Sequence, residues 1–170
     1  MRRPVVIDTN VLLAANGDSS CSNYCVLECI RALRAVQKSG CVVVDNGYEI
    51  LSEYRKQWNP RRQPGAGFLF WKWLLNNQGR PDHCHGVTIT KLEIEGYAEF
   101  PNHEGLRKFD PSDQKFVAVS VVHAARPSIL QATDSKWWGW DAALKECGIA
   151  VEFICSAEIG AKFKKKMGNG

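Results

Sequence analysis

The sequence lacks any uninterrupted apolar run near the roughly 20 residues that a membrane-spanning helix needs. The basic start, Met1-Arg2-Arg3, leads into an apolar stretch that is too short for a signal-peptide core and is closed by Asp8. Internal repeats, heptad arrays and low-complexity segments are also missing, which argues against repeat and coiled-coil architectures. We therefore expect a cytoplasmic protein with no membrane-spanning helix.

The cysteines do not form the pattern of a secreted disulfide framework. There are seven of them, an odd number, and their spacing is irregular. Cys21, Cys25 and Cys29 recur every four residues and share one helix face, which we interpret as a buried apolar stripe. His83-Cys84-His85 is a compact group of soft metal ligands without a second pair at zinc-finger spacing, so structural zinc is not expected.

The length of 170 residues fits one domain with a sizeable core and is short for two. We expect a domain at residues 1–160, with 59–105 as an elaboration within it and 161–170 as a basic tail. The net charge of +4 permits nucleic-acid binding without requiring it. The positive charge gathers in two groups: Arg55, Lys56, Arg61 and Arg62, and then Lys162, Lys164, Lys165 and Lys166.

Strand and helix patterns alternate along the chain. Short apolar runs that stop at turn or acidic residues predict strands at 4–7, 41–44, 87–94, 129–133 and 149–155. Helical periodicity and end signals predict helices at 22–38, 48–58, 68–77, 110–125, 141–147 and from 157 onward. This order predicts a single doubly wound α/β domain with a mostly parallel central sheet and helices on both faces.

Acidic residues fall at the places where such folds bind ligands, outside the carboxyl ends of the strands. Asp8, Asp45 and Asp134 each follow an apolar strand, Asp113 lies in the first turn of a helix, and Glu49 and Glu53 share one helix face. Converging carboxylates repel one another. Divalent cations with a preference for oxygen ligands, Mg²⁺ or Mn²⁺, remove that cost.

Several of these acids also have an ordinary structural interpretation. Asp110 and Asp113 fit an N-cap and a first-turn acid of the same helix. Asp45 fits the N-cap of the next helix, and Asp141 fits that of a later one. Asp8 fits this account least, together with Asp134, because a carboxylate directly after a buried strand is costly without a partner.

The segment Val5-Val6-Ile7-Asp8-Thr9-Asn10-Val11-Leu12-Leu13 resembles the opening of PIN-domain nucleases, an apolar strand followed by Asp-Thr-Asn. Further acids follow in the family's order, within 49–54, 113–119 and 132–135. The resemblance extends from residue 5 to about residue 155. It implies an endoribonuclease that depends on Mg²⁺ or Mn²⁺ and cleaves single-stranded or structured RNA.

The resemblance also implies residue roles. The acidic metal ligands and catalytic residues would be Asp8, Glu53, Asp113 and Asp134. Asn10 would orient the Asp8 loop, and Thr133 would help to hold the site. Glu49 shares a helix face with Glu53, and we assign the main role to Glu53 because the family's acid precedes an apolar or aromatic residue, as in Glu53-Tyr54. Glu49 then has a supporting part.

The basic residues Arg55, Lys56, Arg61 and Arg62 follow this helix face into a loop, and we expect them to bind RNA phosphates. Trp137, Trp138 and Trp140 follow the Asp134 loop, where stacking on bases and core packing are both open. The aromatic segment 68–75 is interpreted as core or as a partner surface.

One departure from the family pattern and two other functions stay open. Many family members carry another acid soon after the position of Asp134, whereas here an aromatic run intervenes before Asp141. Small members include toxins of toxin–antitoxin pairs, so an antitoxin, another protein partner or a second copy of the chain remains open. The alternative to catalysis is a PIN-like module that binds RNA or protein. An aspartyl phosphatase usually has a second Asp where this chain has Asn10.

Overall fold

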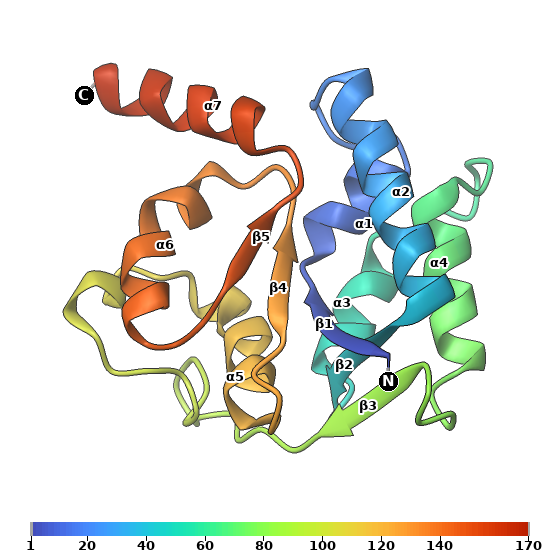
Figure 1. The fold of residues 1–170 in the computed structure, drawn as a ribbon, viewed down its shortest axis with the longest axis horizontal. Coiled ribbons are helices and arrows are strands. Elements are labelled where there is room, and N and C mark those ends of the chain that lie inside the picture. Colours follow the sequence, from blue (N-terminus) through green and yellow to red (C-terminus); the bar gives the residue numbers. More distant parts are fainter. Residues whose placement is uncertain (1, 170) are drawn as a thin grey trace.

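Five short, largely apolar segments pair into one parallel sheet in the order β3-β2-β1-β4-β5 (Figure 1). The computed structural model describes residues 2–169. The strands are β1 (Arg3–Ile7), β2 (Gly40–Asp45), β3 (Cys84–Val87), β4 (Ser128–Gln131) and β5 (Val151–Phe153). Val6 and Ile7 of the central strand are completely buried, as expected where helices cover both faces of a parallel sheet. The predicted α/β class and parallel sheet are confirmed.

Helices cover both faces of this sheet. They are α1 (Thr9–Ala15), α2 (Asn23–Ser39), α3 (Glu49–Lys56), α4 (Ala66–Asn76), α5 (Gln114–Val122), α6 (Ser135–Glu146) and α7 (Ser156–Gly168), with short 3₁₀ turns at Glu104–Leu106 and Pro111–Asp113. The helices α1, α2 and α4 pack together on one side, while α5 and α6 lie on the other (Figure 1). Within residues 2–169, no helix combines the length and the apolar character that a bilayer crossing requires.

The connections reverse the strand order at the centre of the sheet, and we call the region outside the carboxyl ends of β1 and β4 the crevice. From β1 the chain moves outward to β2 and β3, and it then returns to β4 on the other side of β1. The order of the strands therefore reverses between β1 and β4, which pair directly through Val6 and Ile129. Ligands of open α/β sheets bind at such a reversal, outside the carboxyl ends of the strands. Asp8 follows β1, and Asp134 lies three residues beyond β4.

Some predicted elements were wrong in position. Residues 88–94 form no strand, and β3 lies earlier, at 84–87, with a glycine in its middle. The helix expected at 141–147 begins instead at Ser135 and takes the tryptophans into its first two turns. Asp141 is therefore not its N-cap but an interior residue that pairs with Lys145 at 2.6 Å. The sequence also gave no separate signal for α1.

A glycine lets two helices approach closely beside the central crevice. A side chain at Gly67 of α4 would place its Cβ 2.0 Å from the backbone oxygen of Leu12 in α1. That distance is shorter than any side chain tolerates, so α4 can pack on α1 only with glycine at this position. The buried residues Phe70 and Leu74 lie on the same helix. The segment predicted to be core therefore does supply core residues.

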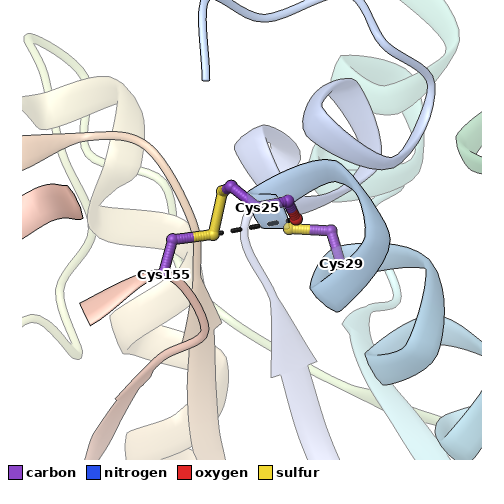
Figure 2. A group of neighbouring side chains, drawn as sticks. All are labelled: Cys25, Cys29 and Cys155. Atoms are coloured by element: carbon purple, nitrogen blue, oxygen red, sulfur yellow. Dashed lines mark hydrogen bonds between the residues drawn. A yellow bond between two sulfur atoms is a disulfide. The ribbon is translucent and has the colours of Figure 1, made fainter. Parts of the chain in front are cut away.

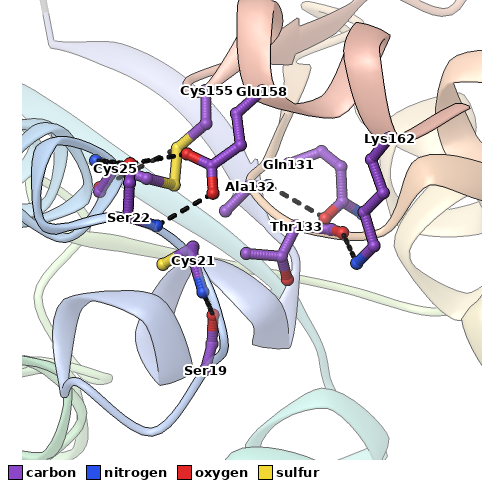
Figure 3. Close-up of a disulfide and its surroundings, with 10 residues drawn as sticks. All are labelled: Ser19, Cys21, Ser22, Cys25, Gln131, Ala132, Thr133, Cys155, Glu158 and Lys162. Atoms are coloured by element: carbon purple, nitrogen blue, oxygen red, sulfur yellow. Dashed lines mark hydrogen bonds between the residues drawn. A yellow bond between two sulfur atoms is a disulfide. The ribbon is translucent and has the colours of Figure 1, made fainter. Parts of the chain in front are cut away.

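A disulfide joins the first turn of α2 to the residue before α7 (Figure 2). Cys25 and Cys155 are separated by 130 residues, with a Cα–Cα distance of 5.4 Å. Cys25 and Cys29 are both fully buried, as the stripe predicted. The disulfide of Cys25 was not predicted. The bond lies beside Ala132 and Thr133 at the end of β4, and Lys162 of α7 donates to the Thr133 carbonyl at 3.2 Å (Figure 3).

Reduction should weaken the attachment of α7, which also carries the lysines expected to form a basic tail. A cross-link that closes a loop of this length contributes on the order of 4 kcal/mol of stability by restricting the unfolded chain. We expect the double variant Cys25→Ser, Cys155→Ser to unfold at a clearly lower denaturant concentration than the oxidised protein. Cys21→Ser removes a nearby free thiol and serves as the control. Equal midpoints for all three proteins would show that the bond adds no stability.

Candidate acidic site

Asp8 lies at the end of the central strand and is almost completely buried, with 2% of its surface exposed. Its carboxylate accepts a hydrogen bond from the Asn10 backbone N–H at 2.9 Å and so caps α1. Burial raises the pKa of Asp8 well above its ordinary value, and the Asp113 carboxylate raises it further. From the sequence, capping was expected of other acids, such as Asp45, and not of Asp8. The single capping bond does not offset the burial of the Asp8 carboxylate, because its pKa stays raised.

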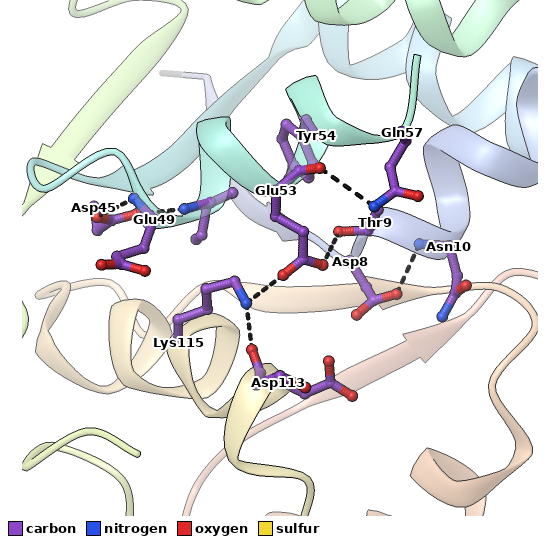
Figure 4. A network of polar contacts seen from close by, with 12 residues as sticks. Asp8, Thr9, Asn10, Asp45, Glu49, Glu53, Tyr54, Gln57, Asp113 and Lys115 are labelled. Atoms are coloured by element: carbon purple, nitrogen blue, oxygen red, sulfur yellow. Dashed lines mark hydrogen bonds and ion pairs between the residues drawn. The ribbon is translucent and has the colours of Figure 1, made fainter. Parts of the chain in front are cut away.

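Glu53 reaches the same crevice from α3. Its carboxylate accepts a hydrogen bond from the Thr9 hydroxyl and forms an ion pair with Lys115 of α5 (Figure 4). Lys115 is 5% exposed, and its ammonium also donates to the Ser112 carbonyl. Glu53 is therefore held between residues that follow β1 and residues that begin α5.

Asp113 lies at the start of α5, and its carboxylate is held by a side chain from α6. The Trp137 indole N–H donates to it at 3.4 Å. Burial raises the pKa of Asp113 from 3.8 to about 6, and the Glu53 and Asp134 carboxylates contribute to the rise. No side-chain capping bond to α5 comes from Asp113 or, on the preceding 3₁₀ turn, from Asp110. Asp110 and Asp113 therefore occupy the predicted N-cap and first-turn positions, on the 3₁₀ turn before α5, without making a capping bond.

Asp134 completes the group beyond β4. Carboxylate oxygens of Asp110, Asp113 and Asp134 all lie within 4.8 Å of one another. Asp134 also caps α6 by accepting from the Lys136 backbone N–H at 2.9 Å, and the Lys136 ammonium contacts Asp110 at 2.9 Å. Four acids named from the sequence, Asp8, Glu53, Asp113 and Asp134, thus converge on the crevice between β1 and β4, and Asp110 lies at its rim.

Other residues named from the sequence do not join this group. Glu49 pairs with Lys91 at 3.2 Å and lies apart from Asp8 and Asp113 (Figure 4). Asp45 caps α3 by accepting from the Glu49 and Ile50 backbone N–H groups, as its position predicted. Thr133 lines a separate small cavity beside the disulfide. The Asn10 contact to Asp8 comes from its backbone.

The four basic residues named for RNA binding are all exposed and lie in different settings. Lys56 is three residues after Glu53 on α3 and lies near its face of the helix, whereas Arg55 is roughly 200° around the helix axis from Glu53. Arg62 pairs with Asp18 at 2.9 Å in the loop after α3. Arg61 is in the same loop.

The tryptophans after Asp134 are packed inside the protein or against neighbouring rings. Trp137 is completely buried, and Trp140 contacts Phe109 with ring centroids 4.4 Å apart. Trp138 contacts Phe153 edge to face at 5.0 Å. Core packing therefore accounts for their positions.

The site has the donor set that a small divalent cation prefers. Asp110, Asp113 and Asp134 bring hard carboxylate oxygens within 4.8 Å of one another. Burial raises the pKa values of Asp8 and Asp113, and repulsion from the neighbouring acids, including that between Asp8 and Asp113, raises them further. Two lysines bring positive charge to this group: buried Lys115 pairs with Glu53, and exposed Lys136 pairs with Asp110 at the rim. A bound Mg²⁺ or Mn²⁺ among Asp8, Asp113 and Asp134 would relieve the remaining repulsion.

The chain was compared with family models, curated proteins and solved structures, and none of them matches it.

The sequence interpretation missed Lys115 and Trp137 as parts of the site. A lysine is almost never buried without a partner, and Lys115 begins a stretch, 115–120, that is buried throughout. If α5 had been expected to be covered on all sides, a carboxylate partner for the buried Lys115 would have been expected as well. Trp137 gave no such signal, because its indole reaches Asp113 only through the packing of α6 on distant parts of the chain, among them the 3₁₀ turn at Glu104–Leu106.

The two glutamates of α3 should behave differently when neutralised. We expect Glu53→Gln to reduce Mn²⁺ affinity, because the change removes a charge and releases Lys115 among the remaining acids. Glu49→Gln should leave Mn²⁺ affinity within about twofold, because Glu49 pairs with Lys91 outside the acidic group and such exposed pairs are weak. Isothermal titration of both proteins measures this, and the opposite ranking would remove Glu53 from the site.

The metal-free protein should lose stability as pH rises. Because the pKa of Asp113 is about 6 when folded and 3.8 ordinarily, the folded state holds a proton that the unfolded chain has lost between these values. Its stabilising contribution is complete below pH 3.8 and is lost as pH passes 6. Thermal melts in chelator should show a smaller fall from pH 5 to pH 7.5 for Asp113→Asn than for the wild type. Identical pH profiles would contradict the shifted pKa.

Proposed function

We propose that the protein is a PIN-like, divalent-metal-dependent endoribonuclease that cleaves RNA phosphodiester bonds at the crevice between β1 and β4. One observation carries the proposal: four carboxylates from separate parts of the chain converge at the reversal point of a parallel sheet, with the pKa values of two of them raised. An arrangement that repels itself costs stability, and a cation site explains why it is present.

In this proposal Asp8, Asp113 and Asp134 hold the metal, Mg²⁺ or Mn²⁺. A bound divalent ion of this kind supplies positive charge to a phosphate and lowers the pKa of water. The protein's own groups prepare the site: the Asn10 N–H fixes Asp8, the Trp137 indole fixes Asp113, and the Lys136 N–H fixes Asp134. These bonds hold the three carboxylates in place before a substrate arrives.

Glu53 and Lys115 have a different role from the three aspartates. The ion pair places an ammonium inside the acidic group, where it partly offsets the negative charge. A fixed positive charge at this point also attracts the phosphate of an RNA chain and the charge that develops during its cleavage. Glu53 holds Lys115 in position, and Thr9 holds Glu53. RNA is the proposed substrate because of the resemblance in sequence and the excess of basic residues.

A second function has one observation in its favour. Because Lys115 pairs with Glu53, one of the four acids is already neutralised without a metal. A PIN-like module that binds RNA or protein without effective cleavage would use such a pair to keep its acidic crevice stable. In that case metal affinity would be weak and the lysine would be a structural counter-ion.

Cleavage of a labelled single-stranded RNA in Mn²⁺ separates these functions. We expect Asp8→Asn, Asp113→Asn and Asp134→Asn each to lower the rate by at least about a hundredfold, because each change removes a metal-binding charge. Asparagine retains the capping bonds of Asp8 and Asp134, so the fold should persist. Asp141→Asn changes an acid of α6 outside the crevice and is the matched control.

The stability of the same variants gives an independent reading. Without metal, Asp113→Asn should melt at a higher temperature than the wild type, since it relieves repulsion. If the wild type cleaves no RNA at any Mn²⁺ concentration while Mn²⁺ leaves its melting temperature unchanged, the nuclease proposal fails and the binding module stands.

A further inference from the structure

A cavity of about 520 Å³ lies between α1 and the loop after α3, apart from the acidic group. Its lining includes Leu13, Gln57, Trp58, Asn59, Arg62 and Phe68. Sites for small organic molecules in proteins commonly have volumes of about 300–1,000 Å³ and a mostly apolar lining with a few polar groups. The cavity has both the size and the mixed lining of such a site.

The cavity adjoins the acidic group along two helices. On α1, Leu13 lies one turn after Thr9, and on α3, Gln57 lies one turn after Glu53. Four residues of helix rise about 6 Å along the axis. Thr9 and Glu53 are hydrogen-bonded to each other, and the Gln57 side-chain amide donates to the Glu53 backbone oxygen at 3.4 Å (Figure 4). The same pair of helices therefore presents both the acidic group and one wall of the cavity.

The apolar part of the lining is aromatic. Trp58 and Phe68 meet edge to face with ring centroids 5.7 Å apart, and Trp71 contacts both of them. Because three rings support one another, the aromatic wall is rigid before any ligand arrives. Flat aromatic ligands bind to such walls by stacking, which contributes to the affinity of single-stranded nucleic acids without requiring a particular base.

The polar part of the lining suits a nucleotide. The exposed side-chain amides of Gln57, Asn59 and Gln63 carry donors and acceptors of the kind that read base edges. Arg62 adds a guanidinium to the lining, held by Asp18 at 2.9 Å. A guanidinium pairs well with phosphate. An aromatic wall, amides and a cation thus meet in one cavity next to the proposed cleavage site.

We infer that this cavity binds one unpaired base of the RNA, adjacent to the phosphate that lies at the acidic group. The inference rests on the proposed function, because it takes the acidic group as the place where the RNA backbone is cut. It goes further by assigning a base-binding subsite to residues 57–63 and to the aromatic wall. This subsite selects a stretch where the RNA is single-stranded, because a paired base is not free to enter it.

The test uses small probes and no metal. The four nucleoside 5′-monophosphates, and ribose 5-phosphate as the probe without a base, are titrated into the intact protein in chelator. We expect at least one nucleotide to bind about tenfold more tightly than ribose 5-phosphate, the size of effect that stacking of one base provides. NMR shifts should include the side-chain amides of Gln57 and Asn59.

Two variants locate the binding. Leu13→Trp fills the cavity from α1 and should abolish the tenfold preference for nucleotides over ribose 5-phosphate. Leu69→Trp makes the same change at an exposed leucine of α4 outside the lining and should retain it. Gln57→Ala, at an exposed position, should weaken nucleotide binding by several-fold and keeps the test decisive if Leu13→Trp does not fold.

The outcomes are separable from those of the nuclease assay. Equal affinity for nucleotides and ribose 5-phosphate overturns the inference, as does a preference that survives both Leu13→Trp and Gln57→Ala. In the first case the cavity serves another ligand, such as a peptide. Base-dependent binding in a protein that never cleaves RNA would remove the catalytic proposal and leave the base subsite in place.

Discussion

Repulsion among the carboxylates at the centre of the sheet is the constraint to which the surrounding structure is fitted. Asp8 is buried at the end of the central strand, and Glu53, Asp113 and Asp134 all raise its pKa. The fold counters this repulsion with hydrogen bonds from Asn10, Thr9, Trp137 and Lys136 and with the buried ammonium of Lys115. These groups come from α1, α5 and α6, so the packing of three helices depends on the same charges.

The reversal of strand order explains why these charges meet. A parallel sheet places the carboxyl ends of its strands at one edge, and the reversal between β1 and β4 leaves room there for helix starts to turn away in opposite directions. The starts of α1 and α6 follow Asp8 and Asp134 directly, and both carboxylates cap their helices. Capping and metal binding are therefore not alternatives for these two residues: the cap orients one oxygen and leaves the other free for a cation.

Local patterns predicted much of this arrangement. The alternation of apolar strand and helix patterns, such as the β-branched run before Asp8 and the apolar body of α5, predicted the parallel sheet and its helix layers. The same patterns placed the acids at the ends of these elements. The rest depended on distant contacts. Glu49 and Glu53 share a helix face, and only their distant partners separate their roles: Lys91 for Glu49, and Thr9 and Lys115 for Glu53. The Cys25–Cys155 bond joins residues 130 positions apart, and no local pattern marks it. The short, glycine-containing β3 carries little strand propensity and is set by its pairing with β2.

The reversal also has a consequence for synthesis on the ribosome. The first 87 residues contain β1, β2 and β3, together with Asp8 and Glu53, but the free side of β1 pairs only with β4, which begins at Ser128. Until then the nascent chain exposes an unpaired, largely apolar strand edge, a surface prone to aggregation. It also carries only half of the acidic group. The chain therefore gains protection of its central strand and a complete set of acids in the same late step, when residues 128–134 leave the exit tunnel.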